Sequence, residues 1–145
     1  MKYLSITLLL LFMQMNLMSQ TRQFEDVPKD ILEHFNEMGT DTSIFLNKYE
    51  AAFLNAIFKD RLNGFDFTNK KVGFIKISGK NGKINYFEMQ KKYFSDERQP
   101  CDNGTLYIFN ATQKKESGGY DAAIVYWSKF LLPVDKVVAI LKRQH

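Results

Sequence analysis

Two segments, KVGFIKIS at Lys71 to Ser78 and KINYFEM at Lys83 to Met89, flank the sequence Gly79-Lys-Asn-Gly82. Both segments are rich in β-branched and aromatic residues, which favour strands, and Asn81-Gly82 is a strong signal for the tight turn of a β-hairpin. This stretch therefore predicts two antiparallel strands, and it decides that the domain is built on a sheet.

Two further strands are expected downstream of the hairpin. TLYIFNA at Thr105 to Ala111 has the composition of a strand, and a polar loop is expected from Thr112 to Gly119. AAIVYW at Ala122 to Trp127 is apolar without alternation, which is typical of a strand that is covered on both faces.

Helical patterns lie at the two ends of the chain. Pro28 to Met38 has apolar residues at helical spacing before Gly39, and Asn47 to Glu50 has the spacing of a capping box for a second helix that ends at Asn63-Gly64. Pro133 opens a last helix. We therefore expect an α+β fold with two N-terminal helices, a mainly antiparallel sheet of about four strands and one C-terminal helix, with the helices on one face of the sheet.

The first 19 residues read as a signal peptide, which leaves residues 20–145 as a single domain. Lys2 supplies a positive start, Leu4 to Met13 is an apolar run of the usual length, and Ser19 is a small residue suited to the cleavage site. An uncleaved membrane anchor is the alternative, but a spanning helix needs roughly 20 apolar residues and this run is shorter. The leader resembles the short, Gln-ending leaders that are common in Bacteroidota. We therefore expect a periplasmic or secreted protein with no membrane span after cleavage.

Composition limits the partners and the chemistry. The net charge of +4 is mild, and an exported domain is not expected to bind nucleic acid. Cys101 is the single cysteine, so it cannot form an internal disulfide, although its thiol is available for an intermolecular one. His34 has no second histidine at a metal-ligand spacing, and the sequence has no Gly-x-Ser-x-Gly or phosphate-binding loop. We expect neither a metal nor a cofactor.

Two segments stand out as candidate binding sites. The hairpin region from residue 70 to 92 carries seven lysines against one acid, interleaved with aromatic residues, and Lys80, Lys83 and Tyr86 are its candidate contacts. Such a ribbon suits an acidic protein, an anionic glycan or lipid headgroups, although lysines also protect sheet edges from aggregation. Gly118-Gly119 places Tyr120 and Asp121 before the buried strand, where loops often carry ligand contacts.

The sequence is most consistent with a non-enzymatic binding domain, such as an inhibitor or immunity-type protein that docks to another macromolecule. The alternative is a pocket for a small ligand or glycan, lined by aromatic side chains and reported by Trp127. The third hypothesis is a small hydrolase that uses Asp121, Glu116 or Cys101. We rank it last because no catalytic motif surrounds these residues.

Overall fold

The computed structural model describes residues 25–41, 43–80, 83–88, 94, 104–126 and 131–143. The predicted leader at residues 1–19, Cys101, Trp127 and the turn residues Asn81 and Gly82 lie outside the described residues. Within the described part, the chain is a mixed α and β structure, as the sequence predicts.

A four-stranded sheet forms the centre of the molecule, with the strand order β2-β1-β4-β3. The strands are β1 (Val72–Lys80), β2 (Lys83–Glu88), β3 (Thr105–Ile108) and β4 (Ala122–Tyr126). β1 pairs with β2 antiparallel and β3 pairs with β4 antiparallel, as expected for neighbouring segments, but β1 and β4 are parallel. The sheet is therefore mixed.

The central position of β4 follows from its composition. All five of its residues are buried, as its unbroken apolar run predicts. A strand of this kind is stable only where both of its faces and both of its edges are covered, so it lies between β1 and β3. β3 is half-buried and ends in an exposed Ile108, and it takes the outer position.

Two helices from the N-terminal part of the chain cover one face of the sheet: α2 (Lys29–Glu33) and α3 (Lys48–Ile57). α2 is shorter than predicted, because the chain passes at His34 into the 3-10 turn η1 (Phe35–Glu37). The predicted capping box of α3 is confirmed: Asn47 accepts bonds from the amides of Tyr49 and Glu50, and the Glu50 carboxylate accepts one from the amide of Asn47.

The second helix ends earlier than the sequence indicates. α3 stops at Ile57 and is followed by the 3-10 turn η2 (Lys59–Arg61). Asn63 and Gly64 both have positive φ, of 48° and 85°, so the left-handed turn predicted there is present.

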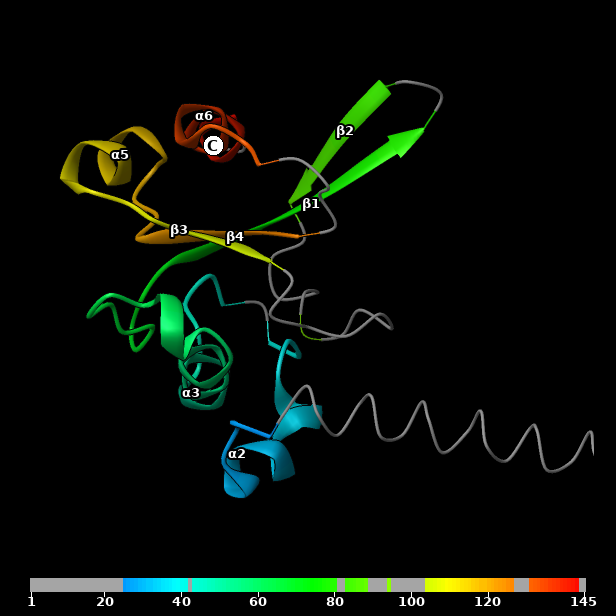
Figure 1. Cartoon of the computed structure of the whole chain (residues 1–145), viewed down its shortest axis with the longest axis vertical. Coiled ribbons are helices and arrows are strands. Elements are labelled where there is room, and N and C mark those ends of the chain that lie inside the picture. Colours follow the sequence, from blue (N-terminus) through cyan, green and yellow to red (C-terminus); the bar gives the residue numbers. More distant parts are fainter. Residues whose placement is uncertain are drawn as a thin grey trace, which may run out of the picture.

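The opposite face of the sheet is covered by α5 (Ala111–Glu116) and α6 (Val134–Lys142), as Figure 1 shows. The expectation that helices cover one face only is therefore wrong, and so is the loop predicted from Thr112 to Gly119. α5 forms because Asn110 and Gln113 make a second capping box, in which each side chain accepts a bond from the other residue's amide.

Two apolar clusters result, one on each face of the sheet. Phe53, Phe58, Phe67 and Phe74 belong to the cluster beneath α3, while Ile75, Val125 and Leu141 belong to the cluster beneath α6. α6 lies very close to β1: a Cβ atom added at Gly73 would be only 2.5 Å from Cδ2 of Leu141. Among the described residues, no helix has the length and apolarity needed to cross a lipid bilayer.

Candidate functional site

The structure does not bring the five predicted contact residues together. Lys80 and Lys83 face each other at the far end of the hairpin, where their register ends. Asp121 bonds instead to Lys71, at the beginning of β1. Nine residue steps along the chain separate Lys71 from Lys80, a distance of roughly 30 Å in an extended strand. The side chains of Lys80 and Lys83 lie outside the described part of the chain, whereas the backbone register places both residues at the turn end of the hairpin.

Tyr86 occupies an intermediate position that links the hairpin to α6. It is half-buried against the apolar cluster that contains Ile77 and Val138. The ammonium of Lys136 on α6 lies 5.4 Å from the centroid of the Tyr86 ring, within the range of a cation–π contact. Tyr86 therefore helps to hold the hairpin against α6, and its exposed edge adjoins a cationic side chain.

Asp121 joins the beginnings of β1 and β4. Its Oδ2 accepts a bond of 2.9 Å from the amide of Lys71, and its own amide donates to the Lys71 carbonyl at 2.8 Å. Its Oδ1 accepts a bond of 2.6 Å from the Lys114 ammonium on α5. Burial alone would raise the pKa of Asp121, but the bonds from Lys114 and from the Lys71 amide outweigh burial and lower the pKa below its ordinary value. Both carboxylate oxygens are thus engaged within the fold.

Tyr120 is likewise part of this junction. Only 5% of its surface is exposed, and the Lys71 ammonium lies 4.2 Å from the centroid of its ring. That ammonium also donates a 2.9 Å bond to the carbonyl of Gly118. Gly118 and Gly119 have φ of 87° and 90°, which non-glycine residues rarely adopt, so the two-glycine turn is what lets the chain return from α5 to β4. We call Lys71, Lys114, Tyr120 and Asp121 the junction cluster.

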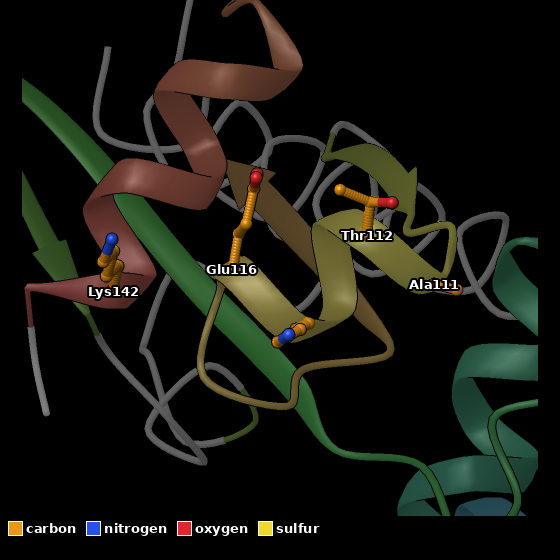
Figure 2. Close-up of a pocket in the computed structure, with 5 residues that line it drawn as sticks. Ala111, Thr112, Glu116 and Lys142 are labelled. Carbon is orange, nitrogen blue, oxygen red and sulfur yellow. The ribbon is translucent and has the colours of Figure 1, made fainter.

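An open groove lies on the outer surface between α5 and α6. Figure 2 shows Glu116 and Thr112 on α5 and Lys142 on α6 along this hollow, whose volume is about 590 Å³. All the residues that line it are exposed; they are Ala111, Thr112, Lys115, Glu116 and Lys142. The groove is therefore a polar surface feature that a large partner can reach directly.

The charges in this groove are not neutralised inside the described structure. The side chains of Lys115, Lys142 and Glu116 form no hydrogen bond or ion pair with any described residue. Two cations and one anion therefore meet solvent in a single hollow. A hollow with this excess of free ammonium groups attracts anionic groups.

Charge also differs between the two helical layers. Residues 25–61, which form the α2–α3 layer, contain eight acids and four bases, a net charge of −4. Residues 109–121 and 131–143, which form the α5–α6 layer, contain five bases and three acids, a net charge of +2. Because the sheet separates these layers, the described part of the chain has one helical layer with a net negative charge and one with a net positive charge.

The geometry offers little for a metal or for acid–base chemistry. Across the described ranges, His, Cys, Asp and Glu side chains form no group of three that could hold a metal ion. Asp121 is fixed by its hydrogen bonds, and Glu116 stands beside lysines rather than beside a second carboxyl group. Two lysines and one glutamate supply the charged side chains of the α5–α6 groove.

A comparison with known families places most of the chain in one of them. The sequence model of the family described as "Domain of unknown function (DUF8192)" matches residues 42–143, more than two thirds of the chain. The chain belongs to this family. The DUF8192 match includes the whole sheet, α3, α5 and α6, and so contains both the groove and the junction cluster. No curated protein and no solved structure matches the chain significantly.

The sequence does not predict the groove of this DUF8192 domain, because the segment that supplies most of its lining residues reads as a loop; Glu116 is named only as a candidate of the hydrolase hypothesis. A signal for the helix is nevertheless present: Asn110 followed three residues later by Gln113 has capping-box spacing, and Ala-Thr-Gln-Lys-Lys-Glu contains good helix formers. The pairing of Lys115 with Lys142 across the groove has no such signal, since it depends on how α5 and α6 pack.

Proposed function

We propose that this chain is an exported, non-enzymatic binding domain that docks to an acidic partner protein through its α5–α6 face, as an inhibitor or immunity-type protein would. The observation that carries the proposal is the groove between α5 and α6, where Lys115 and Lys142 are exposed and have no partner among the described residues. Export rests on the leader at residues 1–19, and it places the domain in the periplasm or outside the cell.

The shape of the groove favours a macromolecule over a small ligand. Sites for small molecules enclose most of the ligand and are lined largely by apolar and aromatic side chains. This groove has a volume within the small-ligand range, but all of its lining residues are exposed and none is aromatic. A partner with its own folded surface can cover such a hollow and exclude water from its charges.

The distribution of charge supports a defined orientation of docking. A basic face attracts an acidic partner over distances of about 8 Å at physiological salt, and it raises the rate of association. The acidic α2–α3 layer repels the same partner, which disfavours contact on the wrong side. This difference in charge favours an approach of the partner from the side of α5 and α6.

The hairpin extends the proposed surface. α6 lies between α5 on one side and β2 on the other, as Figure 1 shows, and Lys136 contacts Tyr86 on the hairpin side. Lys80 and Lys83 lie further along the same hairpin. We include Lys80, Lys83 and Tyr86 in the docking surface, and we assign Tyr120 and Asp121 the supporting role of holding α5 against the sheet.

The test begins with capture of partners from the cell envelope by the full-length gene product, expressed with its own leader and a C-terminal tag. One dominant protein that is lost as salt rises is the expected result. That protein is then purified and titrated against the Lys115→Ala/Lys142→Ala variant, which should bind about tenfold more weakly, since two exposed charge pairs contribute roughly 0.2–1 kcal/mol each.

The matched control removes two exposed lysines from the acidic layer, in the variant Lys29→Ala/Lys48→Ala, and should bind like the wild type. Equal losses in both variants would show that net charge alone, and not the groove, governs binding. Failure to capture any protein at low salt would reject the docking function and favour a screen of small metabolites and glycans.

A further inference from the structure

The carboxylate of Glu116 lies in the groove but does not stabilise the fold. It is the last residue of α5, where the negative end of the helix dipole disfavours a carboxylate. No described residue forms a hydrogen bond or ion pair with its carboxylate, although Lys115 and Lys142 line the same groove. An isolated carboxylate at this position weakens both the helix and the attraction of the groove for anions.

We propose that Glu116 is a selectivity residue, which makes the groove accept a carboxylate-bearing polypeptide segment and reject dense polyanions such as sulfated glycans. This inference rests on the proposed function, because it names the chemistry of the segment that the same groove binds. The occupant is a stretch of partner backbone that carries an Asp or Glu side chain.

The donors and acceptors in the groove match such a segment. Each lysine ammonium has three donors, so Lys115 and Lys142 together can receive a side-chain carboxylate. Glu116 only accepts hydrogen bonds, so it needs a donor from its ligand, and the amide N–H groups of a polypeptide supply one beside every acidic side chain. The groove therefore has a place for both parts of an acidic peptide.

A sulfated polysaccharide lacks this match. Its anionic groups are closely spaced, so an anion that approaches the two lysines brings another acceptor against the Glu116 carboxylate. Repulsion between like charges then opposes binding, which is how a protein discriminates against a partner that would otherwise be attracted. A carboxylate in a basic groove thus lowers the affinity for all anions but lowers the affinity for dense polyanions most, which makes the groove selective.

The experiment compares two probes, heparin and a peptide of alternating Asp and Gly residues, each titrated at low salt against the full-length chain. Glu116→Gln is expected to bind heparin about threefold more tightly, as unit charges about 7 Å apart in a medium close to water would predict. Affinity for the peptide should stay the same or fall, because its amide N–H then meets a neutral amide oxygen, a weaker acceptor than a carboxylate, and this loss offsets the reduced repulsion. The ratio of the two affinities should therefore shift by at least threefold toward heparin.

Three controls make the result specific. Glu33→Gln removes one exposed carboxylate from the acidic layer and should leave the ratio unchanged. Thermal melting of Glu116→Gln should occur at the wild-type temperature or slightly above it, since the helix loses an unfavourable charge. Lys115→Ala/Lys142→Ala should weaken the binding of both probes.

The outcomes separate the two proposals. If the double lysine variant binds both probes like the wild type, the groove does not bind anions and the proposed function itself fails. If the lysine variant weakens binding but Glu116→Gln leaves the ratio unchanged, or shifts it no more than Glu33→Gln does, only the selectivity role is overturned. Tighter binding of the wild type to heparin than to the peptide would also overturn it and identify a glycan as the partner.

Discussion

Gly73→Ala is the sharpest test of how the helix that carries Lys142 is positioned. The new Cβ atom would lie 2.5 Å from Cδ2 and 3.1 Å from Cδ1 of Leu141, which is fully buried. Overpacking of this kind costs roughly 1–3 kcal/mol, while replacing glycine with alanine recovers about 0.4–1 kcal/mol through the unfolded chain. We therefore expect a net loss of about 1–2 kcal/mol and a fall in the melting temperature of about 4–8 °C.

A double-mutant cycle identifies the cause of that loss. Leu141→Ala alone should cost about 2–5 kcal/mol, because it leaves a cavity beneath α6. In the Gly73→Ala/Leu141→Ala variant the added methyl group enters that cavity, so the total loss should be smaller than the sum of the single losses by about 1 kcal/mol. Urea unfolding followed by circular dichroism measures all four proteins. Strictly additive losses, or a Gly73→Ala variant as stable as the wild type, would refute the close approach of α6 to β1.

The lowered pKa of Asp121 means that its carboxylate stabilises the fold above the pKa of the unfolded chain, near 4, and that this contribution disappears as the pH falls through the folded value. Asp121→Asn should therefore lower the urea midpoint at pH 7, and the gap to the wild type should shrink as the pH falls below that of the unfolded carboxyl group. Asn110→Ala and Asn47→Ala each remove a helix cap and should cost about 1 kcal/mol, but only Asn110→Ala should weaken heparin binding, because it loosens α5. Tyr107→Phe loses the 2.7 Å bond from its hydroxyl to the Leu132 carbonyl, and its urea midpoint should report a loss of about 1 kcal/mol.

The elements that sequence predicts correctly are those whose signals are local. Asn47 and Glu50 form the expected capping box because the bonds involved span only three residues. The segments of all four strands are recognisable from their composition, and the full burial of β4 follows from its lack of alternation. These features depend on side-chain type and on neighbours along the chain.

The arrangement of those elements is harder to predict from sequence because it depends on long-range packing. The parallel pairing of β1 and β4 joins residues that lie about 50 positions apart, such as Lys71 and Asp121. The expectation of helices on one face only also fails for this reason, since an apolar strand such as β4 needs a second helical layer that composition does not locate.

In the candidate site, too, local features are predictable from sequence and long-range contacts are not. Tyr120 and Asp121 are distinctive in sequence because two glycines precede them, but the glycines serve the turn and Asp121 serves the junction between strands. The groove is formed by residues of two helices, and the sequence predicts a loop in place of one of them. Capping-box spacing at Asn110 indicates that helix, but not its contact with α6.

The position of β4 has a consequence for how the chain acquires its structure. β1 and β3 each pair with β4 and not with each other, so the sheet is divided into a hairpin and a single strand until residues 122–126 are available. Such non-local pairing gives a high contact order, which slows folding. For a chain that crosses a membrane beginning with its N-terminus, as we propose, the central strand arrives among the last segments. The preceding part therefore cannot complete the sheet until residues 122–126 follow it.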